Sequence, residues 1–242
     1  MTEIYYTISP EIFQKYPGYV RGIVVANHVK NQPSPDELVA LLRKAEEELR
    51  TRLKIENLLE EPYIKSWRDA FRAFGAKPSD FRSSIEAMSR RVLRGDPLPS
   101  INALVDIGNI ISLRHLVPTG GHAIDHLTQD ISLRLATGQE IFVPFGSDQV
   151  EHPTPGEVIF AEGNTVLTSK WTWRQANHTL TLLETEAIEF NVDGLLPVTP
   201  QEVEQICAEI TSVIGQFCGG DMRSELLSQE HPRMKLMCLL NN

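Results

Sequence analysis

The stretch Ser100–Asp125, SINALVDIGNIISLRHLVPTGGHAID, tells more about the fold than any other part of the chain. Its first half places apolar residues at the spacing of an amphipathic helix, and Asn102, Asp106 and Asn109 interrupt that pattern. Side chains three and four residues apart share a helix face, so we expect these three polar groups to point the same way. Polar groups partly withdrawn from water need partners inside the fold or on a ligand. The helix is therefore predicted to form one wall of a binding site.

The second half of the stretch predicts a loop that carries a histidine. The helical pattern stops at Pro118, and the chain then passes through two glycines to His122. An imidazole titrates near neutral pH, so His122 is a candidate general base or a group that orients a water molecule. The residues expected to contact a ligand are Asn102, Asp106, Asn109, Gly120, Gly121 and Asp125.

No metal and no cofactor is expected at this site. His122 and His126 have the spacing of two metal ligands on a helix, but no third ligand lies at a matching distance. The glycine-rich phosphate-binding motifs and the GxSxG nucleophile motif do not occur. The pattern favours polar loop histidines over a metal site.

Composition predicts one folded domain over residues 1–242, because 41% of the residues are hydrophobic and 23% are charged. The net charge of −9 argues against indiscriminate binding of polyanions, which depends on clustered Lys and Arg. Three cysteines form no CxxC pair. The N-terminus does not resemble a signal peptide, and no apolar run approaches the ~20 residues of a membrane span. A cytoplasmic protein without membrane contact is expected.

The first 95 residues predict strands followed by helices. Residues rich in β-branched and aromatic side chains predict strands over 3–8 and 19–29. A capping box that begins at Ser34 predicts a helix running to about Leu59. Two further helices are expected, one ending at Gly75 and the other at Gly95.

From residue 131 the apolar residues alternate as in strands, and turns separate the successive runs. Short turns favour antiparallel pairing. A second capping box, Thr199 to Glu202, predicts a helix that ends at Gly219. The expected fold class is α+β, with a mainly antiparallel β-sheet core, an N-terminal helical layer and a C-terminal helix. Within the single domain we expect an accessory layer over 1–95, a motif-bearing core over 96–190, and a C-terminal helix and tail over 191–242.

Glu184, in TLTLLETEAIEF, is a second candidate for chemistry. On the predicted strand, Leu182 and Leu183 flank it, which favours a partly buried carboxylate. Glu186 and Glu189 lie nearby and support the alternative, a solvated acidic face.

The sequence KWTWR, Lys170 to Arg174, joins two tryptophans to basic residues. On a strand, Trp171 and Trp173 would share one face, and packing in the core is their favoured use. The alternative is that the tryptophans stack on a nucleobase while Lys170 and Arg174 hold a phosphate.

Several motifs, in the right order, resemble one family. SINALVDIGN and HAID resemble the start of the editing domain of the phenylalanyl-tRNA synthetase β-subunit, and AEGNTVLTSKWTWRQANHTLTLLETEAI resembles its later strands. This domain, called B3/B4, also occurs as free-standing proteins. WRDAFRAFGAKPSDFRSSIEAMSRRVLRG and KWTWRQ resemble that free-standing branch. The resemblance covers most of residues 66–190 and implies the fold of that domain.

The resemblance also implies a function for individual residues. His122 matches the histidine that positions the ester end and water in the editing domain, and Glu184 matches the glutamate that recognises the wrong amino acid. These two are the implied catalytic residues, and Asn102 matches an amide that lines the pocket. The residues expected to hold the RNA end are Arg114, Arg134, Lys170, Trp171, Trp173 and Arg174.

Three functions are open. The first is trans-editing, the hydrolysis of mischarged aminoacyl-tRNA, with tRNA as the partner and an aminoacyl-tRNA synthetase as a further candidate partner. The second is a non-catalytic tRNA-binding or synthetase-associated module, which the acidic composition favours. The third is a hydrolase of small amino acid esters or amides. No DNA partner is expected, and nothing resembles the ATP-binding core of a complete ligase.

Overall fold

Residues 2–239 are the part of the chain that the computed structural model describes. Their helices are α1 (Pro10–Lys15), α2 (Asp36–Arg52), α3 (Pro62–Ala73), α4 (Ser84–Leu93), α5 (Ala103–His115) and α6 (Pro200–Phe217), with a 3₁₀ turn at Ile55–Asn57. Their strands are β1 (Thr2–Ile8), β2 (Val20–Asn27), β3 (Thr119–Ala123), β4 (Ile131–Leu135), β5 (Val158–Glu162), β6 (Thr165–Ser169), β7 (Arg174–Gln175), β8 (Ala187–Gly194), β9 (Asp221–Leu227) and β10 (Arg233–Leu239).

These strands form two sheets. One has the order β10-β1-β4-β5-β6-β7, and the other has the order β3-β8-β2-β9. Among the described strands, β1 and β4 are the parallel pair, and all the other neighbours are antiparallel. The predicted fold class, α+β with a mainly antiparallel core, is confirmed.

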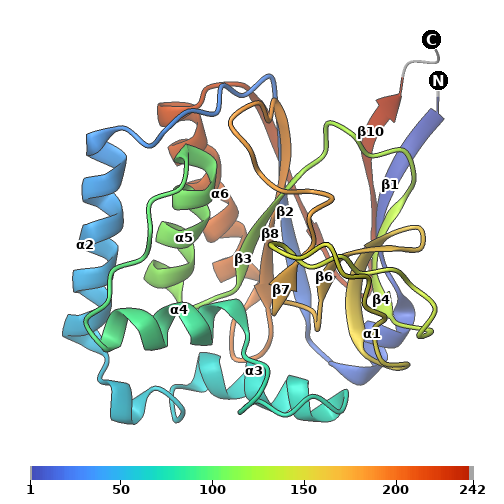
Figure 1. Cartoon of the computed structure of the whole chain (residues 1–242), viewed down its shortest axis with the longest axis horizontal. Coiled ribbons are helices and arrows are strands. Elements are labelled where there is room, and N and C mark those ends of the chain that lie inside the picture. Colours follow the sequence, from blue (N-terminus) through green and yellow to red (C-terminus); the bar gives the residue numbers. More distant parts are fainter. Residues whose placement is uncertain (1, 240–242) are drawn as a thin grey trace.

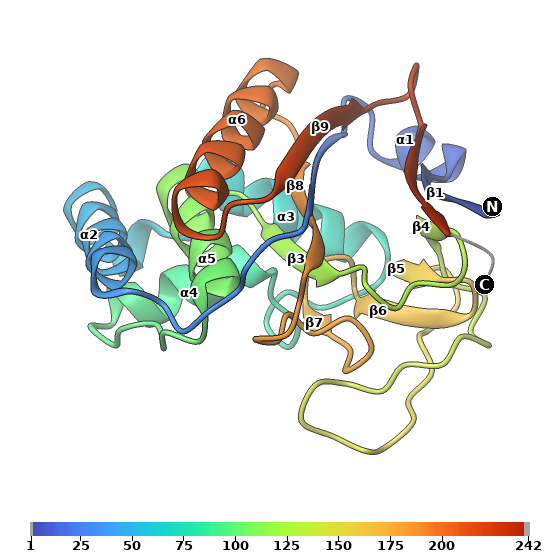
Figure 2. The ribbon, with the colours of Figure 1, turned by 90° about the horizontal axis from the view of Figure 1, so that it is seen from above.

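The four-stranded sheet lies between helices and the six-stranded sheet (Figure 2). Helices α5 and α6 cover one of its faces, and α2 and α4 pack beside α5 as the predicted helical layer (Figure 1). The close approach of α6 requires glycine at position 22 of β2. A methyl group there would lie 2.7 Å from Cγ1 of Val203, and nearer still to Sγ of Cys207.

The opposite face of this sheet is buried too, but it carries polar groups. Register pairs Arg21 of β2 with Asp193 of β8, and His122 of β3 with Glu189 of β8. All four side chains are at most 4% exposed. The guanidinium carbon of Arg21 lies 4.8 Å from the ring centroid of Phe160 on β5. A polar cluster therefore fills part of the space between the two sheets.

The two capping boxes had different outcomes. Thr199 and Glu202 form the predicted box at the start of α6. The box at Ser34 was wrong, because the Ser34 hydroxyl donates to Oδ2 of buried Asp106 at 2.6 Å and does not cap α2. Helix α2 also ends at Arg52, short of the predicted limit.

The sequence patterns in the second half of the chain overstated some strands and missed others. Residues 141–145, where the apolar residues alternate as in a strand, form only isolated bridges. The predicted strand around Glu184 is regular only over β8. Strands β9 and β10 were not predicted, because their residues alternate weakly. None of the described helices has the length and apolar composition needed to cross a bilayer.

Candidate functional site

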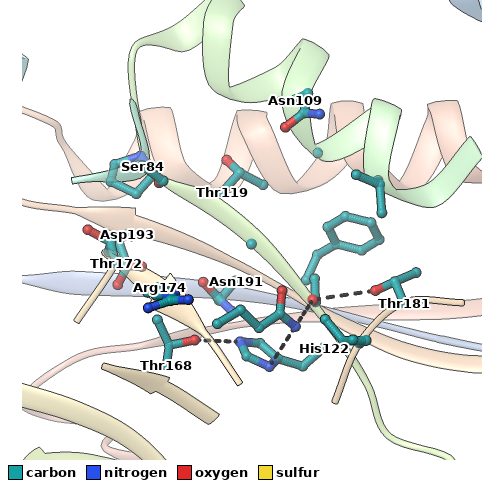
Figure 3. Close-up of a pocket in the computed structure, with 18 of the residues that line it drawn as sticks. Ser84, Asn109, Thr119, His122, Thr168, Thr172, Arg174, Thr181, Asn191 and Asp193 are labelled. Atoms are coloured by element: carbon teal, nitrogen blue, oxygen red, sulfur yellow. Dashed lines mark hydrogen bonds between the residues drawn. The ribbon is translucent and has the colours of Figure 1, made fainter. Parts of the chain in front are cut away.

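A cavity of about 470 Å³ lies where α4 and α5 meet β3, β8 and the turn after β6. Of the predicted ligand contacts, Asn109, Gly120 and Gly121 line it, and so does His122. Figure 3 shows Asn109 and Thr119 on one side of β3, and His122, Thr168 and Asn191 on the other. The cavity therefore wraps around β3, the edge strand of the four-stranded sheet.

The loop predicted to carry His122 is strand β3. Gly121 serves close packing here rather than a turn, since a methyl group on it would lie 3.0 Å from Cδ1 of Ile188 and 3.2 Å from Cε1 of Phe190. Gly121 thus lets the side chains of Ile188 and Phe190 on β8 pack against β3. The prediction of a loop was wrong because the sequence pattern does not distinguish these two uses of glycine.

His122 is fixed on this strand by hydroxyl groups. Its Nδ1 lies 2.6 Å from Oγ1 of Thr179, and its Nε2 lies 3.1 Å from Oγ1 of Thr168. Its ring packs edge-on against Phe160, with the centroids 5.0 Å apart. The imidazole thus has one orientation, and the Thr168 hydroxyl, which also lines the cavity, extends its hydrogen-bonding reach.

Burial and the neighbouring Arg21 lower the pKa of His122 to about 3. The ring is therefore neutral at pH 7, with one nitrogen donating and the other accepting. A base with so low a pKa gains little from proton transfer at neutral pH. The geometry suits His122 to orienting a bound group rather than to exchanging protons with it.

A buried ion pair forms one end of the cavity. Nε of Arg21 lies 3.3 Å from Oδ1 of Asp193. Asp193 also accepts hydrogen bonds from the Tyr19 hydroxyl and from Nε1 of Trp171. Because one carboxylate already balances the guanidinium, this end of the cavity is polar but carries no large net charge.

Glu189 lies behind the cavity wall, beside Asn191. The Asn191 amide donates to Oε1 of Glu189 at 3.1 Å, and Oε2 of Glu189 has no partner among the described residues. Burial raises the pKa of Glu189 to about 7. The predicted alternative of a solvated acidic face is wrong for this residue, which is fully buried.

The cavity wall also has polar groups that form no hydrogen bond with the described residues. The Asn109 side chain, Oδ1 of Asn191 and Oε1 of Gln175 bond to none of the described residues, although Gln175 donates through Nε2 to the Gly121 carbonyl at 3.2 Å. The Thr119 and Thr172 hydroxyls are buried and also without partners there. A small polar ligand would find both donors and acceptors.

Three predicted ligand contacts have structural partners instead and do not line the cavity. Asn102 caps α5 by accepting from the Val105 N–H, and its amide donates to the Thr181 carbonyl. Asp106 accepts from the hydroxyls of Ser34 and Ser100. Asp125 accepts from the backbone N–H groups of Glu186 and Ala187. The expectation that the three polar groups of the helix share one ligand-facing side therefore fails, because Asn102 and Asp106 stabilise the start of α5.

Glu184 lies in an exposed turn rather than on a strand, and it does not line the cavity. The neighbouring Leu182 does line the cavity mouth. The turn forms because the Thr185 N–H donates to the Leu182 carbonyl and the Thr185 hydroxyl accepts from the Leu182 N–H.

Most of the residues predicted to hold RNA are engaged within the fold. Ion pairs join Arg114 to Glu209, Arg134 to Glu140 and Lys170 to Glu157. Trp171 is buried against Tyr16, Tyr19 and Trp67, and Trp173 packs on Phe81. Both tryptophans and Arg174 still line the cavity. The segment from Lys170 is a turn, with positive φ at Lys170 and Trp171, so the predicted single-strand face does not exist.

Sequence reasoning missed Arg21, Thr168, Glu189, Asn191 and Asp193. The signal for three of them was present in β8, where EFNVDG places polar residues at every second position. Arg21 stands in an otherwise apolar strand, which is a sign of a buried partner.

Comparisons with known proteins agree with the resemblance seen in the sequence. The chain is similar to the crystal structure of an N-terminal fragment of the phenylalanyl-tRNA synthetase β-subunit from Pyrococcus horikoshii, with 12% identity and a TM-score of 0.47. That match covers 92% of this chain and 51% of the other, so this chain spans about half the length of that structure. The search of curated proteins gave no match. The model of the B3/4 domain family matches residues 66–219, more than half of the chain. The chain therefore belongs to the B3/4 domain family.

Proposed function

We propose that the protein is a hydrolase that removes an amino acid from a mischarged tRNA, with the aminoacyl ester bound in the cavity beside His122. The observation that carries the proposal is a neutral imidazole held by two threonine hydroxyls at the wall of a cavity with spare hydrogen-bonding groups. An aminoacyl ester is already reactive, so placing a water molecule next to its carbonyl provides much of the required acceleration. Membership of the B3/4 family supports a relation to the synthetase editing domain.

In this proposal His122 and Thr168 orient the attacking water. The Thr168 hydroxyl lies at the cavity wall and is held by Nε2 of His122. Because the imidazole stays neutral far below pH 7, the deacylation rate should show no inflection near pH 6.5 from this histidine.

Gly121 offers a backbone donor at the same wall. The Pro118 carbonyl accepts a hydrogen bond from the Asp193 N–H, and the Ile124 N–H donates to the Ala187 carbonyl. In an antiparallel pair only every second residue of a strand bonds to a given neighbour. Gly121 lies at an odd spacing from both residues, so its N–H and C=O point away from β8. Its carbonyl accepts from Gln175, whereas its N–H has no side-chain or loop partner among the described residues. This N–H is suited to polarising the ester carbonyl as negative charge develops on its oxygen.

The amino acid itself would be recognised by neutral polar groups. Oδ1 of Asn191 and Oε1 of Gln175 are acceptors suited to the α-ammonium group, and Asn109 can contact the side chain. The cavity volume, about 470 Å³, falls in the range of small-ligand sites. Glu184 is outside the cavity and has no part in this proposal.

The test is deacylation of a panel of mischarged tRNAs by wild-type protein and by the variant His122→Ala. We expect the variant to lower kcat by roughly 100-fold, because an oriented water is lost, with unchanged affinity for the tRNA. His126→Ala is the matched control, since His126 is exposed and lies four residues further along. Equal turnover by His122→Ala and wild type on every substrate would refute the proposal.

One observation favours a second candidate, a non-catalytic tRNA-binding module. Both nitrogens of His122 already have protein partners, as expected of a purely structural histidine. Wild-type protein that binds tRNA but deacylates no member of the panel would select this function.

A further inference from the structure

The basic residues of the chain are concentrated in one segment. Residues 65–94 contain eight of the 23 Lys and Arg residues but only three of the 32 Asp and Glu residues. The segment is therefore positive in a protein whose net charge is −9. It comprises most of α3, all of α4 and the loop between them (Figure 1), and the ion pair between Arg68 and Glu86 joins the two helices.

Six of these residues make up what we call the α3–α4 basic surface: Lys65, Arg68, Arg72, Arg82, Arg90 and Arg94. The first three follow the spacing of one face of α3 and line a depression of about 220 Å³. Glu60 borders this depression, and Asp69 pairs with Arg72. The acidic residues are thus outnumbered on this surface.

Buried Glu86 holds three of these arginines in place. Its carboxylate lies 2.8 Å from Arg68, 2.9 Å from Arg90 and 3.9 Å from Arg82. Glu86 is 1% exposed, whereas all three arginine side chains reach the surface. One arginine would suffice to balance one carboxylate, so two positive charges are left over. Their positions are fixed before any partner binds, which reduces the entropy lost on binding.

This surface lies one helix away from the cavity. Ser84 and Met88 on one side of α4 line the cavity, while Glu86 and Arg90 lie on the opposite side. A helix with its side chains is only ~10 Å across. The arginines around Glu86 are therefore about one helix diameter from the cavity wall, within reach of a polyanion whose end occupies the cavity.

We propose that the α3–α4 basic surface binds the phosphate backbone of the tRNA whose aminoacylated end occupies the cavity, an inference that rests on the proposed function. Fixed guanidinium groups bind phosphate oxygens through paired N–H donors. The surface takes the role predicted for Arg114, Arg134 and Lys170. Each of those residues pairs with a carboxylate of its own, whereas three arginines of the surface share the single carboxylate of Glu86.

The test uses the triple variant Lys65→Gln, Arg72→Gln and Arg94→Gln, which leaves the arginines around Glu86 intact. The matched control is Lys15→Gln, Lys30→Gln and Lys44→Gln, three exposed lysines elsewhere that lower the net charge equally. Binding of uncharged tRNA is measured by fluorescence anisotropy over a range of salt concentrations. Deacylation of mischarged tRNA and of the matching aminoacyl-adenosine is measured in parallel.

We expect the surface variant to bind tRNA at least tenfold more weakly, with the slope of log affinity against log salt reduced by roughly 2. KM for mischarged tRNA should rise while turnover of aminoacyl-adenosine is unchanged, and the control should match wild type. Equal losses in both triple variants would overturn the proposal, as would a wild-type protein that does not bind tRNA at low salt. Because tRNA binding is measured without chemistry, an inactive cavity leaves this test intact.

Discussion

The two faces of the four-stranded sheet are both buried, yet they are built from different residues. Toward α5 and α6, strands β2 and β8 present Val24, Ala26, Phe190 and Val192, and glycine at position 22 lets α6 approach closely. Toward the six-stranded sheet, the same strands present Arg21, Glu189, Asn191 and Asp193. Apolar burial stabilises the first face directly. The second face contains charges removed from water, which cost free energy unless they are paired.

The difference shows which face is devoted to stability and which to a site. An apolar pair of equal volume would stabilise the sheet at least as well as Arg21 and Asp193 do. The polar face also borders the cavity. Both His122, whose pKa is lowered, and Glu189, whose pKa is raised, lie on this face. Groups with displaced pKa values that gather at a cavity are typical of functional sites.

The largest expected effect comes from breaking the ion pair of the polar face. Arg21→Met should lower the free energy of unfolding by about 3–5 kcal/mol, because Asp193 is left as an unpaired buried charge. The loss should be greater at pH 8 than at pH 5, since protonation of Asp193 relieves it. Chemical denaturation at both pH values measures this. The double variant Arg21→Met, Asp193→Asn removes the unpaired charge and retains an acceptor for Tyr19 and Trp171, so it should be more stable than Arg21→Met alone. A double variant less stable than Arg21→Met would contradict this explanation.

The next effect concerns the pH dependence contributed by Glu189. Its pKa is about 7 in the folded protein, against 4.5 for an ordinary glutamate, so the folded state binds this proton more tightly than the unfolded state. The stabilisation is fully present below pH 4.5 and is lost as the pH rises through 7. As the pH rises from 5 to 8, the free energy of unfolding of Glu189→Gln should therefore increase by roughly 3 kcal/mol relative to that of wild type. Parallel stability curves for the two proteins over this range would show that Glu189 does not titrate in this way.

The smallest effect is expected on the apolar face, where Gly22→Ala adds one methyl group. Overpacking against Val203 and Cys207 should cost about 1–3 kcal/mol at every pH, because no titrating group is involved. Thermal denaturation measures this loss. Adding Cys207→Ala should restore part of it by removing the nearer of the two atoms. A cost that varied with pH would remove the distinction between the two faces.

The sequence patterns predicted those elements whose signals are local. The β-branched run of β2, the amphipathic stripe of α3 and the capping box at Thr199 each lie within a few residues, and each of these elements formed as expected. Ser34 was misjudged because its partner, Asp106, lies on a helix distant in sequence. A local pattern does not report such a competitor.

The candidate site was predicted only in part, for the same reason. His122 was identified, but its neutral state depends on burial beneath Phe160 and on Arg21, which come from other strands. Asn102 and Asp106 were rightly expected to need partners, yet those partners are backbone groups and the hydroxyls of Ser100 and Ser34. Polarity on a helix face signals that a hydrogen-bond partner exists without saying whether it is a ligand.

The pairing of β9 and β10 has a consequence for the order in which the protein folds. β9 pairs with β2, and β10 pairs with β1, so two strands that come early in the sequence gain neighbours that are synthesised much later. β2 meets its other neighbour, β8, only after all the residues between them have been made. Such distant pairings slow folding and leave early strand edges exposed. The polar face that holds Arg21 is thus assembled late, and a nascent chain arrested before β8 carries this arginine without Asp193.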